Sequence, residues 1–303
     1  MISRQSMPRA GLFLLMIVVL GWGVSWTVIK HAVYEIPPLT IRGVSAVMGG
    51  ACLMLLTRLQ GVSLVVPRKH WLRLSVLALF NILIWNVLST YGVLYLPSGK
   101  AALLAYTMPL WCVPLSIWML HDMMSVRRAV ALLLGCCGVA VLLGREALDL
   151  VHAPIGVILM LAAALVWACG VVMMKRWSLP LDAGVMTAWM LLLGGLPLLP
   201  AAVIVDGIPS HMPSASALFA VLFSAGVTFM LCNWAWNRLV MLVPVSVSSL
   251  SSLLTPLVGV ASGAVFLGER PGWSEALAAM LILGAVAVIN TAPKPAAAKA
   301  VTV

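Results

Sequence analysis

Charged residues are scarce in this chain. Only 9% of its 303 residues are Asp, Glu, Lys or Arg, and just eight of those are acids, whereas soluble domains carry roughly 25% charge. So few charges exclude an ordinary globular protein with a polar surface. The apolar residues, 63% of the total, gather in stretches of about 20, the length of helix that crosses ~30 Å of hydrocarbon. The composition therefore predicts an all-α membrane protein.

The common enzyme motifs are missing as well. The sequence has no Gly-rich phosphate loop that ends in Lys-Ser or Lys-Thr, no His-Glu-x-x-His and no Gly-x-Ser-x-Gly. The first absence excludes an ATP-driven pump that works alone. The five histidines lie in loops or at membrane edges, away from any cluster of acids. We therefore expect no catalytic residue, no cofactor and no bound metal.

Disulfides and nucleic-acid binding are not indicated either. The six cysteines lie inside apolar runs without Cys-x-x-Cys spacing, which is typical of small packing residues. The net charge of +10 comes from basic residues in short loops, which form no patch interleaved with aromatic residues. The expected partners are the lipid bilayer and a small molecule, without nucleic acid, and the protein is expected to function as a monomer.

Ten apolar runs are present, and each is expected to be a transmembrane helix. Pro and Gly punctuate the gaps between them, and no gap is long enough for a soluble domain. The approximate bounds of the runs are 10–29, 39–57, 72–95, 100–120, 128–143, 155–174, 183–205, 216–240, 244–267 and 273–290. The Ala-, Lys- and Pro-rich tail at 291–303 is expected to be a disordered cytoplasmic tail.

The basic residues predict the orientation of the chain. With the N-terminus inside, most of them fall in cytoplasmic loops, whereas only Lys30, Lys100, Arg145 and Arg270 fall outside, in agreement with the positive-inside rule. Both termini are therefore expected in the cytoplasm. The first run has the position of a signal peptide, but it is long and offers no small-x-small cleavage site, so we expect it to be a retained span.

The chain contains an internal repeat. Similar residues recur at an offset of about 145 to 147: Trp22 and Trp167, Lys30 and Lys175, Pro109 and Pro256, and Asp122 and Glu269. The first five-helix repeat spans 1–148 and the second spans 149–290. Because five is odd, the second copy enters the membrane from the opposite side, as in inverted-topology transporters with a site between the copies. The alternative is chance similarity between apolar helices.

Several of these features resemble a known family. The segment Leu267-Gly268-Glu269-Arg270-Pro271, the pair Trp22-Gly23 in the first run and the doubled five-helix unit resemble the drug/metabolite transporter superfamily, in its EamA-type branch. The hinge of the first copy differs, since it reads His121-Asp122-Met123-Met124. A narrower resemblance to bacterial aromatic amino-acid exporters rests on single residues: Tyr106 ahead of Pro109, Trp167, Trp236-Asn237 and Thr255-Pro256. It implies export of amino acids, including aromatic ones, across the bacterial inner membrane without ATP.

Polar and aromatic residues at mid-span indicate a substrate cavity, because burying them in hydrocarbon is costly. The candidates are Trp22, Asn81, Trp85, Tyr106, Trp167, Asn233, Trp236, Asn237, Ser248, Ser252 and Thr255. Aromatic faces would attract an ammonium group, and Asn and Ser would hydrogen-bond a carboxylate or amide. The competing interpretation is that serines let helices approach and that tryptophans anchor span ends.

Two prolines occupy equivalent positions in the repeats. Pro109 and Pro256 each fall inside a predicted span, where a proline kinks a helix by removing a backbone donor. We expect these kinks to be the flexing points of the gates, with packing accommodation as the alternative. Arg42, near the outer end of the second span, is expected to pair with Glu35 or to reach the interface, and is not predicted to contact substrate.

No acid lies at mid-membrane, so no carboxylate is placed to carry a coupling proton. The sequence therefore predicts export that follows the substrate gradient or is only weakly coupled. Two other functions stay open. The same fold would also suit drug-like cations or nucleobases, and a membrane-embedded enzyme or scaffold is an alternative of another class.

Overall fold

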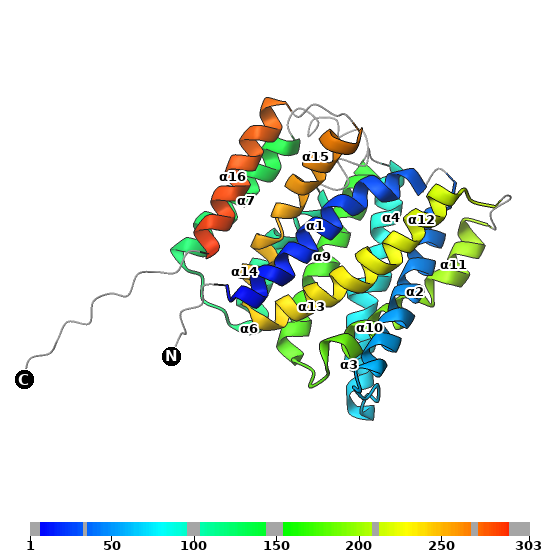
Figure 1. The fold of residues 1–303 in the computed structure, drawn as a ribbon. Helices are drawn as coiled ribbons and strands as arrows, with labels where there is room; N and C mark the ends of the chain where they lie inside the picture. The colour runs from blue at the N-terminus through cyan, green and yellow to red at the C-terminus, as the bar shows by residue number, and fades with distance from the viewer. Residues whose placement is uncertain are drawn as a thin grey trace, which may run out of the picture.

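The computed structural model describes residues 7–32, 35–95, 104–143, 154–207, 212–267 and 272–290. Each of the ten apolar runs contains helix (Figure 1). The first half of the chain comprises α1 (Arg9–Ala32), α2 (Pro38–Leu59), η1 (Arg68–His70), α3 (Trp71–Ala78), η2 (Leu79–Ile84), α4 (Trp85–Tyr95), α6 (Met108–Leu120) and α7 (Val126–Leu143). The hinge at 268–271 and the tail at 291–303 lie outside the described residues.

The second half of the chain repeats this series of helices. It comprises α9 (Pro154–Trp177), α10 (Ala183–Gly195), α11 (Leu198–Val205), α12 (Ala215–Phe223), η4 (Ser224–Cys232), α13 (Asn233–Leu242), α14 (Val245–Ser251), α15 (Leu254–Leu267) and α16 (Trp273–Asn290). The start of α1 and the end of α16 lie at the same end of the bundle (Figure 1). The molecule is therefore an all-helical bundle throughout its described part.

Five helical stretches in the described residues are long and apolar enough to cross a membrane. They are Pro38–Leu59, Arg68–Gly92, Ile155–Trp177, Ala183–Val205 and Ala215–Leu242. Four further apolar helices there are shorter, including Met108–Leu120 and Val245–Gly259. The protein is thus a multi-helix membrane protein, and the count of ten spans stays a prediction.

Turns interrupt three of the predicted spans. In the seventh run a turn at Leu196 and Pro197 separates α10 from α11, and α2, the counterpart in the first half, has no such break. The other two breaks are related by the repeat. In the fourth run a turn at Tyr106 and Thr107 precedes α6, and in the ninth a turn at Ser252 and Leu253 separates α14 from α15. Side chains help to satisfy these turns: the Thr107 hydroxyl donates to the Leu104 carbonyl at 2.6 Å, and the Ser252 hydroxyl to a carbonyl one turn back at 2.7 Å. The two breaks lie about 147 residues apart, as the repeat predicts.

These turns correct the expected kink at the two prolines. Pro109 lies in the first turn of α6 and Pro256 in the first turn of α15. At the start of a helix a missing backbone N–H does not cost an intrahelical hydrogen bond, because the first N–H groups have no intrahelical partner. The prolines therefore follow a helix break and do not kink a continuous helix. Within α6 the interior proline is Pro114.

The third and eighth runs each contain a π-helical segment, η2 and η4. They too fall about 147 residues apart. A π-helix closes i→i+5 hydrogen bonds, so residues five apart in sequence come to lie on one face. This change of period alters which polar residues share a face, with consequences for the pocket described below.

Helix packing follows the repeat. The contact between α1 and α15 has a counterpart in the contact between α9 and α6. Likewise, α1 packs against α12, η4 and α13, and α9 packs against η2 and α4. In addition, α2 packs against α10, and α7 packs against α16. The two halves therefore interlock, because α1 packs against helices of the second half and α9 packs mainly against helices of the first half.

Close backbone approach limits substitution where α2 crosses η4. A Cβ atom added at Gly49 would lie 2.6 Å from the Ala225 carbonyl oxygen and 3.1 Å from Phe229 Cβ. The obstacle is main chain, which cannot rotate away. Gly226 lies on η4 itself, and a Cβ added there meets nothing within 4 Å.

We expect Gly49→Ala to lower the thermal unfolding temperature in detergent, because overpacking of this kind costs ~1–3 kcal/mol. Gly226→Ala, the matched control on the neighbouring segment, is expected to change the free energy of unfolding by no more than about 0.5 kcal/mol and so to leave the unfolding temperature close to that of wild type. Equal unfolding temperatures for Gly49→Ala and wild type would show that α2 and η4 are farther apart than described.

Candidate functional site

A central pocket lies between the two halves of the chain. It is bounded by residues of α1, α2, η2, α4, α9, η4 and α13 and by the residues just before the turn that precedes α6. The lining residues are Trp22, Ser25, Arg42, Asn81, Ile82, Trp85, Asn86, Ala105, Tyr106, Trp167, Thr228, Phe229 and Asn233. Its volume is about 80 Å³. Aromatic rings and uncharged polar groups make up most of the wall, with one cation and no acid.

Four indole rings form one cluster at the pocket. Trp167 on α9 contacts three others: Trp85 with ring centroids 4.8 Å apart, Trp22 at 5.4 Å and Trp236 at 5.6 Å. Trp22 and Trp236 lie 5.8 Å apart. These separations fall in the 4.5–7 Å range of favourable aromatic pairs. Because the four rings come from α1, α4, α9 and α13, the cluster ties both halves together.

The π-helices bring a polar pair from each half to the pocket. Asn81 and Asn86 lie five residues apart across η2, and Thr228 and Asn233 lie five apart across η4. In an α-helix residues five apart point in different directions, but π-helical spacing places them on one face. The two pairs are related by the repeat offset, so each half contributes an equivalent polar wall.

Hydrogen bonds orient these side chains. The Thr228 carbonyl accepts from the Trp22 indole N–H at 3.2 Å and from Asn233 Nδ2 at 3.1 Å. Asn81 Nδ2 donates to the Leu77 carbonyl at 2.9 Å. Asn86 Nδ2 donates to the Ile82 carbonyl at 2.7 Å. Since only the NH₂ end of an amide can donate to a carbonyl, these bonds define which end of each asparagine is the oxygen.

Several buried polar atoms at the pocket have no hydrogen-bond partner among the described residues. They are the Oδ1 atoms of Asn81 and Asn86 and the hydroxyl of Thr228. An unmet buried acceptor costs about 1–3 kcal/mol, so its presence calls for an explanation. A ligand that supplies hydrogen-bond donors to this wall would remove that cost.

The structure brings six of the predicted site residues to the pocket: Trp22, Asn81, Trp85, Tyr106, Trp167 and Asn233. Trp236 lies one layer behind, 1% exposed, with its ring against Trp22 and Trp167. Its indole N–H has no partner among the described residues. The predicted aromatic residues thus lie in or directly behind the wall of one cavity.

The other predicted site residues lie elsewhere. Asn237 is buried and donates to the Thr187 hydroxyl at 2.9 Å, which joins α13 to α10. Ser248 and Ser252 donate to carbonyls of their own helix at 3.1 and 2.7 Å, and Thr255 is fully buried. The predicted hydroxyl stripe does not line the pocket, because α14 is packed between α6, α7, α9 and α16. In this structure Ser248, Ser252 and Thr255 lie outside the pocket wall.

Sequence reasoning missed Arg42, Asn86 and Ser25 as lining residues. Asn86 was not predicted because it lies five residues after Asn81, and in an α-helix residues five apart lie on different faces. Arg42 lies in the second turn of α2 and faces the pocket. Its expected partner Glu35 instead accepts hydrogen bonds from the Ser214 backbone N–H at 2.6 Å and the Ser214 hydroxyl at 2.7 Å.

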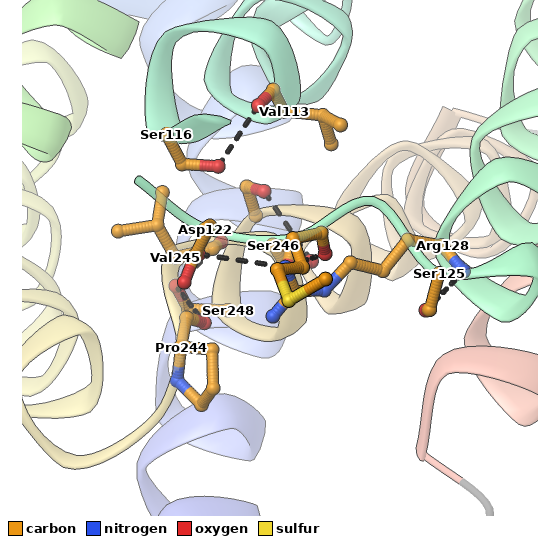
Figure 2. Close-up of polar contacts among 11 residues, drawn as sticks. Val113, Ser116, Asp122, Ser125, Arg128, Pro244, Val245, Ser246 and Ser248 are labelled. Atoms are coloured by element: carbon orange, nitrogen blue, oxygen red, sulfur yellow. Dashed lines mark hydrogen bonds and ion pairs between the residues drawn. The ribbon is translucent and has the colours of Figure 1, made fainter. Parts of the chain in front are cut away.

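A second polar cluster lies where α6 ends and α14 begins (Figure 2). Asp122 forms an ion pair with Arg128 at 3.6 Å, and that guanidinium also donates to the Met123 carbonyl at 2.8 Å. Nearby, the Lys175 ammonium donates to the carbonyls of Val240, Met241 and Val243 at 2.8–3.1 Å. A cation there satisfies the last carbonyls of α13 and matches the helix dipole.

A cavity of about 400 Å³ adjoins this cluster. It is lined by Leu120, Asp122, Lys175, Leu242, Val243, Pro244 and Val245. Its walls come from α6, α9, α13 and α14. Of these, α6 follows the turn in the first half and α14 precedes the turn in the second half.

A multi-helix membrane protein with a small polar and aromatic pocket between two related halves is a transporter by fold and site. The chain belongs to the EamA-like transporter family, which it matches twice, at residues 9–144 and 154–291. The two matches cover nearly the whole chain and meet between α7 and α9. They show the two-repeat organisation that the internal similarity predicts.

Relatives along the full length carry transporter names. The chain is 29% identical over 270 residues to the uncharacterized transporter YoaV of Bacillus subtilis, covering 88% of this chain and 91% of that protein. It is 29% identical to the uncharacterized inner membrane transporter YedA of Escherichia coli (95% and 92% covered) and 27% identical to a probable amino-acid metabolite efflux pump of the same species (91% and 93% covered).

A solved crystal structure shares the fold. It superposes on 93% of this chain and 96% of its own with a TM-score of 0.78 at 21% sequence identity. At this identity the likeness concerns the arrangement of helices and not the substrate.

We expect Trp167→Leu to destabilise the protein by about 2 kcal/mol or more, since it removes three aromatic contacts and leaves a cavity. Trp118→Leu on α6 is the matched control, because Trp118 is 74% exposed and faces away from the cluster. Thermal unfolding in detergent measures the effect, and near-UV circular dichroism reports the loss of ring contacts. Similar unfolding temperatures for the two variants would contradict the cluster's role.

Proposed function

We propose that this protein exports small metabolites, with amino acids, including aromatic ones, as the leading substrates. Transport occurs by alternating access through the central pocket, between two five-helix repeats of inverted topology that together cross the membrane ten times. Both termini lie in the cytoplasm, and the protein functions as a monomer.

The observation that carries this proposal is the pocket wall. Each half supplies one tryptophan of a repeat-related pair, Trp22 and Trp167, and one polar pair across a π-helix. A site built from equivalent parts of both halves is what alternating access between repeats requires. A scaffold has no need of a polar pocket at this place, and the family match does not favour an enzyme.

The size of the pocket favours small cargo. Pockets for drug-sized ligands measure about 300–1,000 Å³, whereas this one encloses about 80 Å³. A small amino acid fits such a space with little rearrangement. An aromatic amino acid requires the indole cluster to part, which we expect during the transport cycle. The name of the Escherichia coli relative, a probable amino-acid metabolite efflux pump, supports the same class of cargo.

The absence of acids from the pocket wall bears on coupling. No Asp or Glu occurs among the lining residues, and a proton-coupled transporter usually relies on a buried titratable group. We infer that export follows the substrate gradient.

The two repeat-related breaks in the helices are the proposed gate hinges. Each turn is followed within a few residues by Pro109 or Pro256, whose missing N–H prevents an i→i−4 bond across the break. The helix before the break and the helix after it can therefore tilt separately. The cluster at Asp122 and Lys175 lies at one end of these helices.

Purified protein in liposomes is expected to release labelled amino acids faster than protein-free liposomes do. A panel of amino acids, nucleobases and organic cations, such as tetraphenylphosphonium, separates the proposed cargo from the drug-like and nucleobase alternatives. Flux that is equal with and without protein across the whole panel would contradict transport. Substrate accumulation that occurs only when a pH gradient is imposed would contradict gradient-following export.

We expect Pro109→Ala and Pro256→Ala each to lower turnover by roughly fivefold or more, because gate motions limit many turnover rates. Alanine restores the backbone donor and so lets the two helix segments join. Pro114→Ala is the control, since Pro114 lies inside α6 on its exposed side and away from the turn. Initial rates of counterflow in liposomes give the comparison, and unchanged turnover in Pro256→Ala would rule out this hinge.

A further inference from the structure

The pocket contains one full charge, and it is positive. Arg42 reaches the pocket from α2, a helix that otherwise packs its small residues against α10 and η4. Among the described residues its guanidinium has no hydrogen bond and no ion pair, and no acid lines the pocket. A charged group inside a membrane protein is costly and marks a functional site when no internal partner neutralises it.

The same pocket wall contains hydrogen-bond acceptors that lack donors. The amide oxygens of Asn81 and Asn86 are buried and lack donors among the described residues, while the NH₂ groups of both side chains are engaged by helix carbonyls. These oxygens can only accept. The pocket therefore offers a fork of cationic donors on α2 and a pair of acceptors on η2 and α4, and α2 packs against α4.

The position of Asn81 is held by packing. A Cβ added at Gly170 of α9 would lie 2.4–2.6 Å from the amide atoms of Asn81. The amide therefore lies flat against a helix surface that has no side chain at this point. Such close support keeps the acceptor in place in the absence of a ligand.

We propose that the pocket recognises the zwitterionic end of a free α-amino acid. Arg42 binds the α-carboxylate, the oxygens of Asn81 and Asn86 accept from the α-ammonium, and the indole cluster receives the side chain. Guanidinium and carboxylate match in geometry and can form two parallel hydrogen bonds. A cationic drug gains nothing from Arg42 and is repelled by it. This inference rests on the proposed transport function.

Arg42 has no counterpart in the second half. At the repeat offset of about 145 residues α10 carries Thr187, which is engaged by Asn237. The polar pairs across the π-helices are repeated, but the cation is not. The two ends of the substrate are therefore held by the first half of the chain, whereas the aromatic wall is shared by both.

The test uses the full-length protein in liposomes and two sets of isosteric probes. L-phenylalanine is compared with 2-phenylethylamine, which lacks the carboxylate, and with 3-phenylpropanoate, which lacks the ammonium; L-alanine, ethylamine and propanoate form the small set. In at least one set, we expect the unlabelled amino acid to inhibit flux of the labelled amino acid at a concentration about tenfold or more lower than either analogue requires. A factor of about ten corresponds to the free energy of one charged hydrogen bond. An amine that competes as well as the amino acid would overturn the role of Arg42, and an acid that does so would overturn the role of the asparagines.

The variants Arg42→Gln and Asn86→Leu assign the two ends. Arg42→Gln is expected to raise the amino-acid concentration that gives half-maximal flux by about tenfold or more. Asn86→Leu is expected to abolish the preference for phenylalanine over 3-phenylpropanoate. Arg58→Gln, which removes an exposed arginine at the far end of the same helix, serves as the control. Unchanged half-saturation in Arg42→Gln would refute the proposal.

Thermal unfolding separates binding from folding. Because Arg42 lacks an internal partner, Arg42→Gln is expected to unfold at the same or a higher temperature than wild type without substrate, and to lose the rise that L-phenylalanine or L-alanine produces in wild type. A lower unfolding temperature with the substrate-induced rise intact would make Arg42 a structural residue. If wild type transports no amino acid at all, the proposed function fails; if it does and the variants match it, only this inference fails.

Discussion

Backbone groups in hydrocarbon must find their hydrogen-bond partners inside the protein, and this constraint shapes the molecule. Among the described residues helices satisfy most of this requirement. The turns in the fourth and ninth runs and the two π-helical segments are the irregularities that the two halves share. All four irregularities lie in buried or half-buried helices near the contact of the two halves. There, the hydroxyls of Thr107 and Ser252 and the amides of the asparagines supply or receive the hydrogen bonds that regular helix would otherwise provide.

The irregular segments also build the pocket. A π-helical turn places residues five apart on one face, so Asn81 and Asn86 project together, as do Thr228 and Asn233. The indole cluster then fills the space between the halves. Because its rings come from four helices, the cluster couples the packing of the two halves to the shape of the cavity. Movement of either half must therefore change the pocket.

Duplication explains most of this architecture and leaves one asymmetry. The helix breaks, π-helical segments and first-helix tryptophans recur in both halves, whereas the cation at Arg42 and the engaged hydroxyl at Thr187 do not. Two copies of one unit have thus kept the helix breaks and the π-helical segments and have diverged at a position that lines the pocket. The same divergence is seen at the hinge sequences, where His121-Asp122 stands in place of Gly268-Glu269.

Apolar run lengths and the internal repeat determined the fold class from the sequence alone, because a bilayer imposes helix length and the offset recurs over many spans. The aromatic lining was also predictable, since Trp22, Trp85 and Trp167 are large groups at mid-span. Tertiary structure decided the rest. The serines of α14 pack against neighbouring helices, and Arg42 turns inward, because helix rotation depends on contacts that no single run contains. Asn86 joined Asn81 only through a π-helical turn, a change of period that the hydrophobic pattern does not record.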